Sequence, residues 1–115
     1  MGKTRAEVRL TAGAEHDLSG IYRRRLIQRG AEGGDGAEAL LDRLVNGIEG
    51  LADYPARGPV PPELEAIGIR AYHQLSLPPY RVIYLPEGTR VTVLIVADSR
   101  RDFRTLLEER LLRGG

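Results

Sequence analysis

The sequence predicts a small α+β fold, in which a helical hairpin packs on a mostly antiparallel sheet in the order β-α-α-β-β-β-α. Three observations predict it: alternating apolar residues open the chain, two amphipathic stretches follow, and strand patterns return from residue 69 before a last amphipathic stretch. Neither half could bury its apolar face alone. We therefore expect the 115 residues to form one domain, 1–115, with the hairpin at about 12–53 and the sheet and C-terminal helix at about 69–112.

The first strand and first helix are marked by a change of period. Apolar and charged residues alternate over 5–10, which is typical of a strand with one buried face. Thr11 can cap the helix that follows, and apolar residues then recur at helical spacing until Gly30, which is expected to end it.

The second helix follows a glycine-rich turn at 30–36. Asp35 and Glu38 have the spacing of a capping box with Asp35 as the cap. Behind them lies a wide apolar stripe: Leu40, Leu41, Leu44, Val45, Ile48 and Leu51. Gly47 and Gly50 weaken a helix, so we expect close backbone contact there or an early helix end.

Residues 54–68 form a loop with four prolines and room for one helical turn at 62–66. Strands are expected at 69–77, 80–85 and 91–97; they are joined by a turn at Pro78-Pro79 and a hairpin turn at 86–89. The nearly continuous apolar run of 91–97 predicts a central strand that is covered on both faces. Ser99 to Asp102 again has capping-box spacing, ahead of a helix that begins near Phe103.

Composition limits the possible functions. Hydrophobic residues make up 42% and charged residues 29%, which suits a soluble globular domain. The net charge of +1 disfavours a protein that binds nucleic acid over its whole surface, but it leaves room for a local basic patch. There is no cysteine, no convincing metal-ligand spacing, no secretory signal and no apolar run long enough to cross a bilayer. We expect a cytoplasmic protein without a metal or other cofactor.

Several segments together resemble one known family. Val8-Arg9-Leu10-Thr11 leads into Ala14-Glu15-His16-Asp17-Leu18, which resembles an "A-x-x-D-L" helix start, and Gly68-Ile69-Arg70 with Tyr80-Arg81-Val82-Ile83-Tyr84 resembles a central hairpin. Val93 to Ala97 with Arg100-Arg101-Asp102 resembles a closing strand and "R-R-D" corner. In order and spacing, from about Val8 to Leu112, the chain resembles the RelE/ParE superfamily of type II toxin–antitoxin toxins, nearer its ParE-like branch.

The resemblance implies a growth inhibitor that binds DNA gyrase and is neutralised by a cognate antitoxin in a hetero-oligomer. Two alternatives stay open: a ribosome-dependent mRNA endonuclease, and a non-toxic module that only binds an antitoxin. Fold alone does not choose between them.

The nuclease alternative needs groups that stabilise charge and transfer protons. Arg81 occupies the strand position that matches the family's arginine, and His73 or a tyrosine would have to lie beside it. After the last strand the chain has Asp98-Ser99-Arg100, with no His or Tyr there. A catalytic pair of Arg81 and His73 is thus expected only under this alternative.

Binding surfaces are predicted from charge and apolar pattern. Arg81, Arg100, Arg101 and Arg104 are the expected target-binding residues, since arginine suits an acidic or phosphate-bearing surface. For the antitoxin, which in such systems threads an amphipathic segment over apolar grooves, the expected contacts are Leu18, Tyr22, Phe103 and Leu107. The competing interpretation is that the apolar stripe of the last helix docks against the sheet or the helical hairpin. Arg23-Arg24-Arg25 splay about 100° apart on a helix, which favours a solvated helix face.

Overall fold

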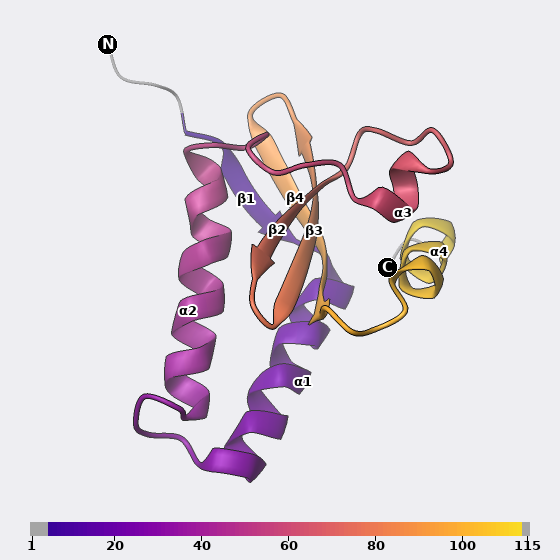
Figure 1. The fold of residues 1–115 in the computed structure, drawn as a ribbon. Coiled ribbons are helices and arrows are strands. Elements are labelled where there is room, and N and C mark those ends of the chain that lie inside the picture. The colour runs from indigo at the N-terminus through magenta and orange to yellow at the C-terminus, as the bar shows by residue number, and fades with distance from the viewer. Residues whose placement is uncertain (1–4, 114–115) are drawn as a thin grey trace.

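The computed structural model describes residues 5–113 (Figure 1). Its elements are β1 (Glu7–Leu10), α1 (Ala12–Arg29), α2 (Ala37–Glu49), a short 3-10 helix (Gly50–Ala52), α3 (Pro62–Glu65), β2 (His73–Leu77), β3 (Tyr80–Glu87), β4 (Arg90–Asp98) and α4 (Phe103–Arg113). The predicted order β-α-α-β-β-β-α is confirmed, with the two short helices added between α2 and β2. The turn at α3 lies where the proline-rich loop left room for one.

The four strands form one mixed sheet in the order β1-β4-β3-β2. β1 runs parallel to β4, whereas β4 with β3 and β3 with β2 are antiparallel. β4 therefore has a strand on each side, and its apolar residues are buried against both layers of helices. The prediction of a central, doubly covered strand at 91–97 is confirmed.

The sheet separates two cores. The helical hairpin covers one face, where the first core contains buried residues of α1, α2, β3 and β4, among them Ile21, Leu40, Leu44, Ile48, Val82, Tyr84, Val93 and Val96. α3 and α4 cover the other face with the second core: Leu64, Ile83, Ile95, Ala97, Phe103, Leu106 and Leu107. Figure 1 shows the hairpin and the α3–α4 pair on opposite sides of the sheet.

Both ends of α1 form as the sequence predicts. The Thr11 side chain accepts the Ala14 N–H at 3.1 Å, which satisfies one of the free donors of the first turn. Gly30 follows the last turn with φ 77°, a conformation that disfavours residues with a Cβ, and its N–H bonds Leu26 O.

The predicted cap of α2 is wrong. Gly36 is the N-cap residue, and it offers no side chain to the helix. The Asp35 carboxylate instead pairs with Arg25 at 3.3 Å and Arg29 at 3.2 Å, both from the end of α1. The tertiary contact between the two helices has replaced the local cap.

Two further boundaries differ from the sequence prediction. β2 begins at His73 rather than at residue 69, because Ile69 turns back to bond Leu64 O and packs against the second core. At α4, Asp102 rather than Ser99 acts as the cap, since its carboxylate accepts both the N–H and the hydroxyl of Thr105.

Close contact or an early helix end was expected at Gly47 and Gly50, and the structure shows one of these at each position. A Cβ on Gly47 would lie 2.7 Å from a Leu77 methyl, so the Leu77 side chain packs directly against the α2 backbone there. At Gly50 the α-helix ends and a 3-10 turn begins. Among residues 5–113, no helix is long and apolar enough to span a membrane.

Candidate functional site

A cleft of about 770 Å³ lies between α1 and the neighbouring ends of β3 and β4. One wall is α1, and the other is formed by Pro79, Tyr80 and the corner that follows β4. Its lining is rich in arginine and includes His16, Asp17, Gly20, Arg23, Arg24, Arg25, Gln28, Asp98, Arg100 and Arg101. Segments from both ends of the chain thus meet at one basic surface.

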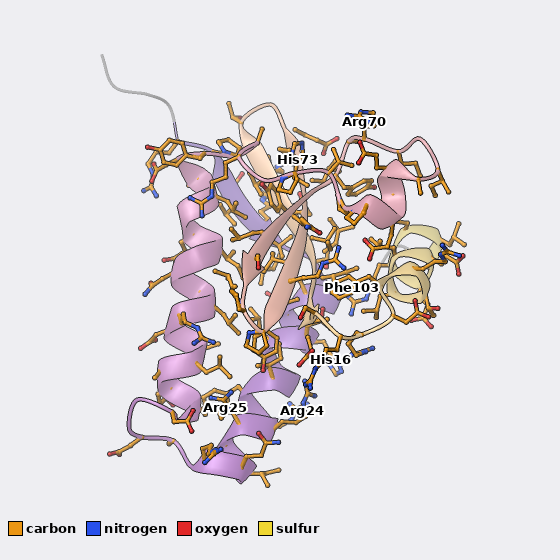
Figure 2. The ribbon with its side chains drawn as sticks, viewed as in Figure 1. His16, Arg24, Arg25, Arg70, His73 and Phe103 are labelled. Atoms are coloured by element: carbon orange, nitrogen blue, oxygen red, sulfur yellow. The ribbon has the colours of Figure 1, made fainter. Side chains whose placement is uncertain are left out.

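The α1 wall has a helical repeat. His16, Gly20 and Arg24 are four residues apart, so they lie along one line of the helix. A Cβ on Gly20 would lie only 3.3 Å from an Arg24 guanidinium nitrogen, which shows that the Arg24 side chain lies back along the helix over this glycine. Figure 2 shows His16 and Arg24 on the same side of α1, while Arg25 points toward α2.

The opposite wall is a compact corner at the end of β4. Asp98 accepts hydrogen bonds from the Arg100 backbone N–H and guanidinium, each at 2.9 Å. These bonds lower the pKa of Asp98 to about 2 and raise the pKa of Arg100. The corner is further held by the Ser99 N–H, which donates to Pro79 O at 2.7 Å.

Pairing divides the arginines of the cleft into two groups. Arg25 pairs with Asp35 and Arg100 pairs with Asp98, so their charges are compensated inside the protein. Arg23, Arg24 and Arg101 are exposed and have no ion pair within residues 5–113. The cleft therefore presents three uncompensated guanidinium groups from two separate elements.

Asp17 belongs to the lining of the cleft and binds two other elements. Its carboxylate accepts the Val96 backbone N–H at 2.9 Å, on the edge of β4 that β1 leaves uncovered. It also accepts a guanidinium N–H of Arg110 at 2.6 Å, and Arg110 donates in addition to Leu94 O. The aspartate of the "A-x-x-D-L" segment thus joins α1, β4 and α4.

Arg81 points to the other face of the sheet. Its guanidinium makes a bidentate bond to Glu63 at 2.9 Å on both oxygens, donates to Gln74 Oε1, and lies 4.0 Å from the centre of the Phe103 ring. Only 14% of the side chain is exposed. The ion pair lowers the pKa of Glu63. In this arrangement Arg81 connects α3, β2 and α4.

His73 lies on the face of the sheet opposite to the Arg81 side chain. Its register partner is Tyr84, with the two rings 5.9 Å apart, whereas Arg81 is paired with Ser76. The His73 Nδ1 is 2.5 Å from the Gly58 carbonyl oxygen. Tyr84 belongs to the first core and Arg81 packs on the second, so the structure does not bring His73 and Arg81 together.

A family model for the ParE toxin of the type II toxin–antitoxin system parDE matches residues 8–103. The chain belongs to the ParE toxin family. It is a toxin of a type II toxin–antitoxin system in the sense of that family. No curated protein sequence matches it.

Two solved structures share the ParE-family fold. A chain of the chromosomal ParDE toxin–antitoxin system from P. aeruginosa superimposes with a TM-score of 0.66 at 17% identity, covering 84% of this chain and 98% of its own. A chain of the RelBE2 toxin–antitoxin complex from Mycobacterium tuberculosis gives a TM-score of 0.58 at 22% identity, covering 84% and 94%. At these identities the likeness concerns the fold.

The expected antitoxin contacts of this ParE-family chain fall into two groups. Phe103 and Leu107 are each 2% exposed in the second core, so in the isolated chain they are not available to a partner. Leu18 is half-buried against the first core. Tyr22 is half-buried too, and its hydroxyl donates to the Glu38 carboxylate, a bond that raises the pKa of Tyr22.

The expected target contacts also separate. Arg100 and Arg101 lie at the cleft, and Arg104 is exposed on the first turn of α4. Arg81 is enclosed between Glu63 and Phe103. Within the described part of the chain, no group of three or more His, Asp or Glu side chains could hold a metal ion.

The sequence predicts a solvated helix face for the arginines of α1, but it does not show that this face lines a cleft. Arg23, Arg24 and Arg25 do splay, as the helix geometry requires, but all three line the cleft. The spacing of His16, Gly20 and Arg24 could have indicated this face. The three residues are four apart, so a small residue lies between a histidine and an arginine on one side of the helix. Nothing in the sequence indicates that this side of the helix faces Arg101.

Proposed function

We propose that this ParE-family toxin inhibits growth by binding DNA gyrase in the cytoplasm, without chemistry of its own, and that a cognate antitoxin neutralises it in a hetero-oligomeric complex. The family match over residues 8–103 supports the ParE branch. Both structural relatives come from toxin–antitoxin systems, which supports an antitoxin partner.

One observation carries the choice between gyrase binding and RNA cleavage. Arg81 donates four hydrogen bonds to Glu63 and Gln74, and its predicted proton-transfer partner His73 projects from the opposite face of the sheet. General acid–base catalysis needs the proton-transfer group within hydrogen-bond reach of the reacting atoms. Arginines that bind a surface require no such partner, and the exposure of Arg101 and Arg104 supports this role for them.

The test is a supercoiling assay with purified gyrase and the purified toxin. We expect the parent toxin to inhibit supercoiling and the double variant Arg101→Ala/Arg104→Ala to need at least tenfold more protein, at about 0.7 kcal/mol or more for each side chain. Arg57→Ala/Arg70→Ala, which removes two exposed arginines elsewhere, is the matched control and should inhibit like the parent.

Mapping of RNA ends after induction in cells separates the alternatives. Under our proposal, DNA synthesis falls before protein synthesis and no new RNA cut sites appear. New cut sites that depend on Arg81 would instead establish the nuclease. A chain that slows neither process but co-purifies with its antitoxin would be the non-toxic module.

A further inference from the structure

We propose that the cleft between α1 and the β4–α4 corner is a nucleic-acid site, which takes the phosphodiester backbone of a single strand. This goes beyond the gyrase proposal, because it assigns a ligand class to a cleft whose α1 wall that proposal does not use. The charge, the floor and the size of the cleft all favour such a ligand.

Charge supplies the attraction. Arg23 and Arg24 on α1 and Arg101 on the corner are exposed and have no ion pair within the described residues. Guanidinium groups bind phosphate oxygens through two parallel hydrogen bonds, and each phosphate contact also releases counterions. The two acids of the lining are already paired, Asp98 with Arg100 and Asp17 with Arg110.

The floor of the cleft favours a phosphate backbone over an amphipathic peptide. Its apolar members Ile21, Val96 and Ala97 are only 3%, 2% and 6% exposed, so a peptide would find little apolar surface to cover. An amphipathic helix in a groove gains its affinity from such surface. A sugar–phosphate chain needs donors and positive charge instead, and the walls provide both.

Size and aromatic rings favour a single strand. A volume of about 770 Å³ matches the range of small-ligand pockets, about 300–1,000 Å³, and is too small for a duplex to enter. Tyr80 and His16 bring planar rings to the lining. Proteins that bind single strands combine a basic groove with rings on which bases stack.

The experiment measures fluorescence anisotropy of a labelled oligothymidylate with the full chain, at salt concentrations between about 50 and 200 mM. We expect the parent to bind, with an affinity that falls as salt rises. Arg24→Gln/Arg101→Gln should weaken binding by at least tenfold and lower the salt slope by about 1.4, which is about 0.7 for each lost contact to a single strand. Arg57→Gln/Arg90→Gln removes the same charge outside the cleft and is the matched control.

Three results would overturn the proposal: no binding at the lowest salt, an equal loss of affinity in the control and the cleft variant, or binding of an oligoglutamate peptide as tightly as the oligonucleotide. The last result would identify a site for acidic peptides. Because gyrase is absent from this assay, none of these outcomes bears on gyrase inhibition, and failure of the supercoiling assay leaves this site untouched.

Discussion

A guanidinium group that is largely removed from water needs partners for its donors, and the surroundings of Arg81 supply them. Glu63 accepts two bonds, Gln74 accepts from the same group, and the Phe103 ring covers its face. Removing Glu63 or Arg81 leaves the charge of the other unmatched, which costs more than the pair itself contributes. Arg81, which the sequence suggests as a functional residue, instead holds α3, β2 and α4 together at the second core.

This arrangement makes stability depend on pH in a defined direction. The pKa of Glu63 lies below its ordinary value of 4.5, so its ionised form is favoured by folding. The stabilisation is therefore fully present above about pH 4.5 and is lost as the pH falls through the folded-state value. Glu63→Gln should lower the free energy of unfolding by about 1.5–3 kcal/mol at pH 7.

Urea unfolding at several pH values checks this prediction. The difference between parent and Glu63→Gln should shrink as the pH drops below 4.5. Glu65→Gln breaks the exposed pair with Arg70 and should cost under about 1 kcal/mol. A constant difference across the whole pH range would show that the carboxylate charge of Glu63 does not stabilise the fold.

The structure buries Phe103 and Leu107, although the sequence predicts that both contact an antitoxin, so substitutions there should affect stability. Phe103→Ala should cost about 3–5 kcal/mol of unfolding free energy and Leu107→Ala about 2–5 kcal/mol, through lost contacts and a cavity. The exposed Leu112 is the control, with an expected change within about 0.5 kcal/mol for Leu112→Ala. Thermal unfolding measures all three. Unchanged melting together with lost antitoxin binding would return both residues to the partner surface.

At the scale of elements, the sequence predicts most of the fold because periodicity is a local property. The two helices of the hairpin each bury one repeating set of side chains, whereas β3 and β4 carry short apolar runs that are buried on both faces, and the type of all four was predicted correctly. Caps and strand starts were predicted less well. Asp35 has the local sequence of a cap, but Arg25 and Arg29 of the preceding helix bind it instead. Such a competition is decided by tertiary contacts, which a local pattern does not contain.

The loop before β2 illustrates a contact of this kind. The Gly58 carbonyl is bonded by the His73 ring, the Gly58 N–H donates to the Tyr84 hydroxyl at 3.1 Å, and the next residue, Pro59, accepts the Gln74 N–H. A Cβ on Gly58 would stand 1.9 Å from the Gln74 carbonyl oxygen. The loop can lie against the edge of β2 only because this position has no side chain.

Gly58→Ala should therefore detach the loop and destabilise the protein by about 2 kcal/mol or more, in the range of overpacked positions. Hydrogen exchange at the Gln74 amide reports the detachment directly, and urea unfolding gives the free energy. Gly34→Ala is the matched control, because a Cβ there meets nothing within 4 Å. Protection of Gln74 that survives in Gly58→Ala would mean that the loop adapts around the added methyl group.

At the scale of the whole molecule, the candidate site was the least predictable part. The residue types were visible, but the assembly depends on which face each strand residue takes and on which distant segments meet. A single step along β2 separates His73 from Gln74, which bonds Arg81. The cleft joins Arg24 to Arg101 across most of the chain, through a topology in which β4 lies between β1 and β3. The period of the apolar residues determines neither the face that His73 takes nor the proximity of Arg24 to Arg101.

The two layers of helices are connected through an ion pair that is largely shielded from water. Asp17 on α1 and Arg110 on α4 are only 14% and 17% exposed, and each also bonds the backbone of β4, at Val96 and Leu94. These bonds occupy polar groups on the β4 edge beyond the end of β1. The pair therefore satisfies an open sheet edge and holds α4 in place across it, so the two cores should unfold together.

A double-mutant cycle tests this connection. Asp17→Asn alone should cost about 3 kcal/mol, because it leaves the Arg110 charge without its counter-ion. Combined with Arg110→Gln, the second change should cost less than in the parent, with a coupling energy of about 1–3 kcal/mol. Asp42→Asn, on the exposed side of α2, should add to Arg110→Gln within about 0.5 kcal/mol.

Hydrogen exchange separates the two contributions of Asp17. The Val96 amide should exchange faster in Asp17→Ala, which removes its acceptor, but should stay protected in Arg110→Gln, which leaves that acceptor in place. If the cycle is additive and both variants expose Val96 equally, the ion pair does not connect the layers and α4 is held by the apolar contacts of the second core alone.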